Sequence, residues 1–150
     1  MTTVQHERHA DVGLPSGVKA WTMALGVGAL LQGLWAYGWP RGFYDRFPIE
    51  GAGWVSTLGP FNEHLTTDVG AALIGMGAAA VYSARHASSA GLAAVTAGFA
   101  IFGAAHFAFH LGELHHFGAG SVVAQVFSLL LLVVWPAGLF AAVRVGRSAR

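Results

Sequence analysis

The stretch that decides the fold is GLAAVTAGFAIFGAAHFAFHLGELHHF, residues 91–117. It contains no charged side chain before His106, and as a helix its length would be about 40 Å at 1.5 Å per residue. That exceeds the roughly 30 Å hydrocarbon thickness of a bilayer. The sequence therefore predicts a membrane-spanning helix whose last turn, with His115 and His116, protrudes to the interface.

The composition of the whole chain supports the same class. Of the 150 residues, 55% are hydrophobic and only 10% are charged, whereas about 25% are charged in ordinary soluble domains. The chain has no Cys, which excludes disulfides and thiolate metal sites. A net charge of +1 gives no indication of nucleic-acid binding. We expect an integral membrane protein whose first partner is the lipid bilayer.

Apolar stretches of spanning length occur four times, so the sequence predicts an all-α single domain, an antiparallel bundle of four transmembrane helices. The expected spans are residues 18–39, 62–84, 91–117 and 121–143. Residues 1–17 are expected to form a polar cytoplasmic tail. The aromatic loop at residues 40–61 is expected either to cover the mouth of the bundle or only to anchor it at the interface.

The distribution of Lys and Arg predicts the orientation. One side of the membrane would carry six of them: Arg8, Lys19, Arg85, Arg144, Arg147 and Arg150. The other side would carry only Arg41 and Arg46. Because cytoplasmic loops are enriched in basic residues, we expect a multi-pass protein of the plasma (inner) membrane with both termini cytoplasmic and the aromatic loop outside.

Polar side chains are spaced so that they share helix faces. His106, His110 and Glu113 are at i, i+4 and i+7 in the third span, and His64 and Asp68 are at i and i+4 in the second. In antiparallel helices the two sets would lie at similar depth in the outer leaflet. Because ionisable groups cost roughly 2.5–3.5 kcal/mol each at the bilayer centre, their presence indicates a functional site.

We therefore expect a transition-metal ion bound by His64, Asp68, His106, His110 and Glu113. Imidazole and carboxylate ligands without sulfur suit copper, iron, zinc or manganese. Three neighbouring polar side chains, those of Asn62, Gln32 and Gln125, are expected to orient the imidazoles. Asn62 is also expected to be the N-cap of the helix over residues 62–84. Glu113 and Glu63 are the candidates to move protons in catalysis.

The leading functional hypothesis is a metal-dependent membrane oxidoreductase that acts on a small or lipophilic substrate. Two alternatives stay open: a non-catalytic accessory subunit of a larger membrane complex, and haem bound by two of the histidines. Transfer of protons or ions across the membrane is disfavoured, because no ionisable residue lies between Gly91 and His106.

Two resemblances add to this interpretation. His106-x-x-x-His110 resembles the histidine boxes of membrane di-iron hydroxylases, although those boxes read His-x-x-His-His. More of the chain resembles small four-helix membrane proteins common in actinobacteria. These share Phe-Tyr-Asp-x-Phe-Pro, here Phe43–Pro48, and Gly-Pro-Tyr/Phe-Asn-Glu-His-Leu-x-x-Asp-Val-Gly, here Gly59–Gly70. The second resemblance implies a four-helix fold and no particular activity.

Overall fold

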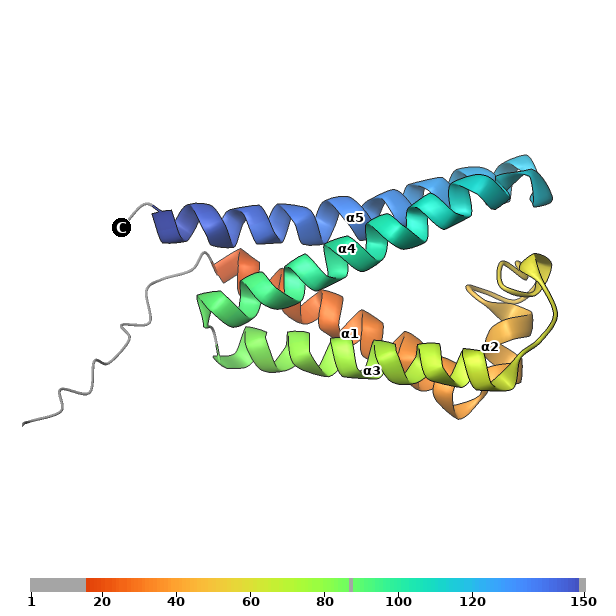
Figure 1. Ribbon diagram of the computed structural model, residues 1–150, viewed down its shortest axis with the longest axis horizontal. Coiled ribbons are helices and arrows are strands. Elements are labelled where there is room, and N and C mark those ends of the chain that lie inside the picture. Colours follow the sequence, from red (N-terminus) through yellow and green to blue (C-terminus); the bar gives the residue numbers. More distant parts are fainter. Residues whose placement is uncertain (1–15, 87, 149–150) are drawn as a thin grey trace, which may run out of the picture.

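The structure, a computed structural model, describes residues 16–86 and 88–148, and within these ranges it is helical with short connections and no strand. The elements are α1 (Ser16–Gly38), α2 (Pro40–Arg46), η1 (Ser56–Leu58), α3 (Glu63–His86), α4 (Ser89–Glu113), η2 (Leu114–His116) and α5 (Ala119–Ser148) (Figure 1). The predicted tail at residues 1–17 lies outside the described residues except at its last two positions.

The expectation of four transmembrane helices is wrong. The described residues form five α-helices, and three segments are long and apolar enough to cross a membrane. These segments are Glu63–His86, Ser89–His116 and Ala119–Gly146. They indicate a membrane protein. Helix α1 is not among them.

The additional helix, α2, lies within the segment expected to be a loop. It begins at Pro40, whose ring fixes φ near the helical value and whose missing N–H is not needed in the first turn. The Arg41 guanidinium binds the Asp45 carboxylate 2.7 Å away, one turn along the helix. Asp45 also raises the pKa of Arg41 above its usual value. Pro40 therefore ends one helix and starts another.

Two side chains close the starts of the later helices. The Asn62 Oδ1 atom accepts a hydrogen bond from the Leu65 amide at 3.0 Å, which confirms Asn62 as the cap of α3. The Ser88 hydroxyl accepts one from the Gly91 amide at 3.0 Å at the start of α4. Helices α3, α4 and α5 begin within two residues of the predicted positions.

The helices pack as two pairs. Helix α1 packs mainly on α3, and α4 mainly on α5, while contacts between the pairs are few. Glycines explain the closeness of the first pair: a Cβ atom on Gly77 would lie 2.7 Å from the Gly26 carbonyl oxygen, and one on Gly33 would lie 2.8 Å from the Gly70 carbonyl oxygen. Only glycine permits such an approach. The α3 glycine at position 75, by contrast, faces open space.

The core lies near one end of the molecule. One buried cluster joins the start of α1, the end of α3, the start of α4 and the end of α5; its members are Val18, Ala84, Leu92, Ala93, Leu139 and Val143. A second cluster comprises Leu25, Ala29, Ala80 and Phe99. From this end the two pairs diverge, and α2 and η1 lie at the opposite end between them (Figure 1).

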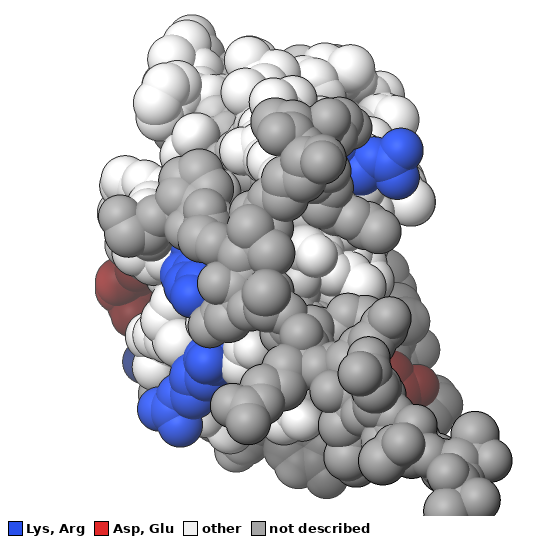
Figure 2. Space-filling view, turned by 90° about the vertical axis from the view of Figure 1, so that its left-hand side faces the viewer, with Lys and Arg blue, Asp and Glu red and all other residues white. Residues whose placement is uncertain are grey.

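Basic residues are distributed over both ends. Lys19, Arg85 and Arg144 lie near the helix ends next to the Val18 cluster, and Figure 2, which views this end, shows several basic side chains in blue. Arg41 and Arg46 belong to α2 at the other end. Lys19, Arg85 and Arg144 therefore lie at the opposite end of the described structure from Arg41 and Arg46.

Candidate functional site

The candidate site is a cavity of about 660 Å³ between the two helix pairs, called here the interhelix cavity. Its walls come from α1, α3, α4, α5 and the connecting segment, residues 39–62. Most of the lining is apolar; the polar exceptions include Gln32, Tyr44, Asn62, Thr66, His106, His110, Gln125 and Ser128. None of the described residues that line it is Asp, Glu, Lys or Arg. A concave apolar space with a few polar groups is typical of small-molecule sites.

The connecting segment closes one end of this cavity through aromatic packing. Phe43 is buried, with its ring centroid 5.5 Å from that of Trp35 and 4.8 Å from that of Phe47. The Phe47 carbonyl accepts a hydrogen bond from the Trp54 amide at 3.0 Å. Phe43, Phe47 and Trp54 all line the cavity. This is the arrangement expected if the aromatic loop covers the mouth of the bundle.

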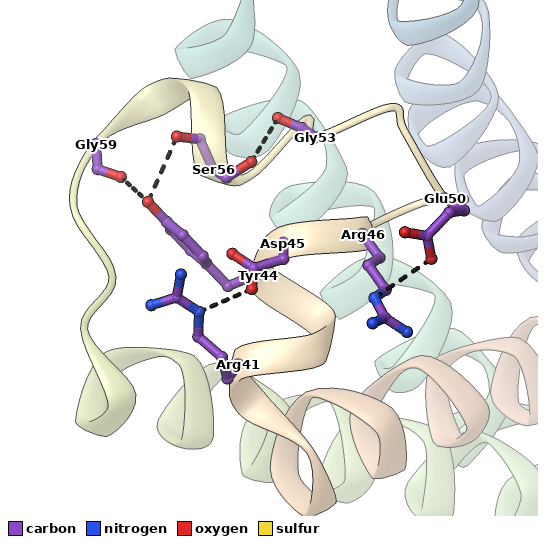
Figure 3. A network of polar contacts seen from close by, with 8 residues as sticks. All are labelled: Arg41, Tyr44, Asp45, Arg46, Glu50, Gly53, Ser56 and Gly59. Atoms are coloured by element: carbon purple, nitrogen blue, oxygen red, sulfur yellow. Dashed lines mark hydrogen bonds and ion pairs between the residues drawn. The ribbon is translucent and has the colours of Figure 1, made fainter.

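A polar network holds the connecting segment in place (Figure 3). The Tyr44 hydroxyl donates to the Gly59 carbonyl, so it ties α2 to the residues just before α3. The Ser56 and Thr57 hydroxyls donate to the Gly53 carbonyl at 3.2 and 2.8 Å. Gly53 has a φ of 57°, in the left-handed region that favours glycine. The turn before η1 therefore depends on that residue.

Two histidines predicted as ligands do lie together on the cavity wall. The ring centroids of His106 and His110 are 4.6 Å apart, as their i, i+4 spacing predicted. Phe102 stacks on His106 at 5.4 Å, and Phe109 contacts His110 edge to face at 5.4 Å. The Nδ1 atom of His110 is buried and has no hydrogen-bond partner among the described residues. The Gln125 side chain lies beside the His110 ring.

Gln125 of α5 is the most deeply buried polar group of the cavity. Its side chain is 0% exposed and lies beside His110, yet within the described part of the chain no hydrogen bond of normal geometry reaches either amide atom, Oε1 or Nε2. Leaving a buried polar group unpaired costs about 1–3 kcal/mol. Near the Leu25 cluster, the indole Nε1 of Trp135 is also unpaired. The cavity thus holds polar atoms that a bound molecule would satisfy.

The other predicted metal ligands lie away from the cavity. His64 and Asp68 share a face of α3, with Nε2 and Oδ2 3.4 Å apart, but their side chains are 87% and 61% exposed. Glu113 faces His116 instead, with Oε2 and Nε2 3.3 Å apart, where α4 gives way to η2. None of the three lines the cavity, and Glu63 is exposed at the start of α3. His115 is exposed at the end of α4, as expected of an interfacial residue.

The five predicted ligands are therefore not brought together. Across residues 16–86 and 88–148, no group of three His, Asp or Glu side chains could hold a metal ion. The reason is helix rotation: the glycine contacts set the face that α3 turns towards α1, and His64 and Asp68 remain on its exposed surface. The residues present do not fit the predicted metal centre.

The three polar residues expected to orient the imidazoles all line the cavity: Gln32, Asn62 and Gln125. The cavity wall formed by Phe99 and Phe102 was not predicted from the sequence. The signal was present, because Phe99, Phe102, His106 and His110 follow the three- and four-residue spacing of one helix face.

Comparisons of the chain with protein-family models, with curated proteins and with solved structures find no match. The resemblance to small actinobacterial membrane proteins stays a prediction.

Proposed function

We propose that this membrane protein binds a small lipophilic molecule in the interhelix cavity. The observation that carries the proposal is the cavity itself: about 660 Å³ of mainly apolar space, bounded by both helix pairs and closed by the aromatic connecting segment. Cavities of roughly 300–1,000 Å³ with this character are typical of small-molecule sites. A lipophilic ligand would reach the cavity from the bilayer, which dissolves it.

Filling the cavity tests the proposal. Gly28 lines the cavity, and a Cβ atom built on it meets nothing within 4 Å, so the first atom of the Gly28→Leu side chain meets no neighbour. Gly75→Leu is the matched control, because Gly75 also faces open space but does not line the cavity. Binding is measured as energy transfer from tryptophan to diphenylhexatriene, with the purified chain in nanodiscs. We expect Gly28→Leu to lower the signal and Gly75→Leu to leave it unchanged. Equal signals in all three proteins would overturn the proposal.

The predicted metal-dependent oxidoreductase stays a prediction, as do the haem and accessory-subunit alternatives. Of the five ligands expected, only His106 and His110 face the cavity. Elemental analysis and absorption spectra of protein purified without chelator measure metal and haem content directly.

We also propose a plasma-membrane location with the connecting segment outside and the α3–α4 turn in the cytoplasm. The distribution of basic residues supports this orientation. Lys19, Arg85 and Arg144 lie at the end of the molecule that contains the α3–α4 turn, whereas α2 carries only Arg41 and Arg46.

A further inference from the structure

The residues that line the interhelix cavity indicate which head group its ligand has. We propose that the ligand is an uncharged long-chain molecule with a hydroxyl or amide head group; this inference rests on the proposed function. That head group binds at Gln125 and His110, and its chain extends towards Trp135.

The residues that line the cavity indicate that the ligand is uncharged. No Asp, Glu, Lys or Arg is among the described residues that line the cavity. A carboxylate, phosphate or ammonium head group would lose its hydration there without gaining an ionic partner. The site therefore selects against fatty acids and phospholipid head groups.

The head-group position comes from the unpaired polar atoms. Gln125 presents both a donor, Nε2, and an acceptor, Oε1, from a fully buried side chain. The Nδ1 atom of His110 is unpaired on the neighbouring helix, and both residues line the same cavity. A hydroxyl and a primary amide each donate and accept, so either satisfies Gln125. A plain hydrocarbon satisfies none of these atoms.

The direction of the ligand's hydrocarbon chain follows from the order of lining residues along the helices. Ten residues separate Gln125 from Trp135 on α5, which corresponds to about 15 Å of helix. Between them α5 contributes Ser128, Leu129 and Leu132, and α4, which packs beside α5, contributes Phe99 and Phe102. The cavity is therefore polar near Gln125 and apolar along the length that a hydrocarbon chain would occupy.

Competition with four molecules of one chain length tests the inference: hexadecanol, hexadecanamide, hexadecane and hexadecanoate. Each competes for diphenylhexatriene bound to the full chain in nanodiscs, and the signal that survives in Gly28→Leu is subtracted. We expect the alcohol or the amide to compete about tenfold better than the alkane, since one buried hydrogen bond changes affinity by about that factor. Whichever of the two binds more tightly identifies the head group.

A matched pair of variants tests the position. Gln125→Leu should reduce the affinities of the alcohol and the amide to that of the alkane, and circular dichroism measures whether the variant is folded. Gln32→Leu removes the same group from α1 on another cavity wall and should retain the preference.

The outcomes separate this inference from the proposed function. If dye binding does not distinguish the unmodified chain from Gly28→Leu, the proposed function fails. If dye binds but the alkane or the carboxylate competes equally well, or Gln125→Leu keeps the preference, only the head-group inference fails.

Discussion

Gly77 of α3 lies against Gly26 of α1 so closely that a Cβ atom on Gly77 would be 2.7 Å from the Gly26 carbonyl oxygen. The partner is backbone, which has less freedom to move than the end of a side chain. This contact and the similar one between Gly33 and Gly70 join α1 to α3. They also determine which face of α3 remains exposed. That exposed face carries His64 and Asp68, two of the predicted metal ligands.

The first prediction concerns this contact. Gly77→Ala should lower the free energy of unfolding by about 1–3 kcal/mol, because the added methyl group must push two backbones apart. Gly75→Ala is the control on the same helix, where the new Cβ meets nothing within 4 Å. It should be neutral or stabilise the protein by up to about 1 kcal/mol, since alanine favours helix more than glycine does. Thermal unfolding in detergent, followed by circular dichroism, measures both. Equal loss in both variants would contradict the contact.

The second prediction concerns the hydroxyl of Tyr44, which donates to the Gly59 carbonyl. Tyr44→Phe should lower the free energy of local opening of the connecting segment by about 0.5–1.5 kcal/mol, the usual net contribution of one hydrogen bond. Amide hydrogen exchange in residues 47–60 should become faster, with no change in α4. Tyr37→Phe removes a hydroxyl from an exposed tyrosine of α1 and should leave exchange in that segment unchanged. Unchanged exchange in Tyr44→Phe would show that the aromatic packing alone holds the segment.

The third prediction concerns stability without ligand. Gln125 is fully buried with both amide atoms unpaired. In delipidated protein, Gln125→Leu should therefore raise the free energy of unfolding by about 1–3 kcal/mol, because leucine of similar size removes the unpaired groups. Gln32 is only half-buried, and Gln32→Leu should change stability much less. If Gln125→Leu destabilises the protein instead, Gln125 has partners that the described structure does not show.

The fourth prediction concerns the metal hypothesis. The His64 side chain is 87% exposed and does not line the cavity, whereas His106 and His110 do. His64→Ala should therefore leave the metal content of the purified protein unchanged, whatever that content is. Elemental analysis of the unmodified chain, His64→Ala and His110→Ala measures it. Loss of metal in both variants would restore the five-ligand site and require α3 to rotate relative to the described arrangement.

The fifth prediction concerns orientation. The chain has no Cys, so single cysteines report their own surroundings. In intact cells, a membrane-impermeant thiol reagent should label Thr57→Cys in the connecting segment and should not label Ser88→Cys in the α3–α4 turn. Labelling of Ser88→Cys alone would reverse the proposed orientation.

The sequence by itself determined the helical class and the helix boundaries, because both depend on local properties. Apolar length predicted the helices over residues 63–86, 89–116 and 119–146 to within a few residues, and Asn62 was recognised as a cap. Side chains that share a helix face were also predicted correctly, as in His64 with Asp68 and His106 with His110. Helical periodicity alone decides those neighbours.

Only the tertiary structure decided which faces meet. The number of helices differed from the prediction because Pro40 begins α2, and α1 is not among the segments that could cross a membrane. The rotation of each helix about its axis depends on contacts such as Gly26 with Gly77, whose partners are far apart in the sequence. That rotation leaves His64 and Asp68 exposed and turns Gln125, His106 and His110 into the cavity. Periodicity sets which residues share a helix face, whereas close packing between helices sets where that face points.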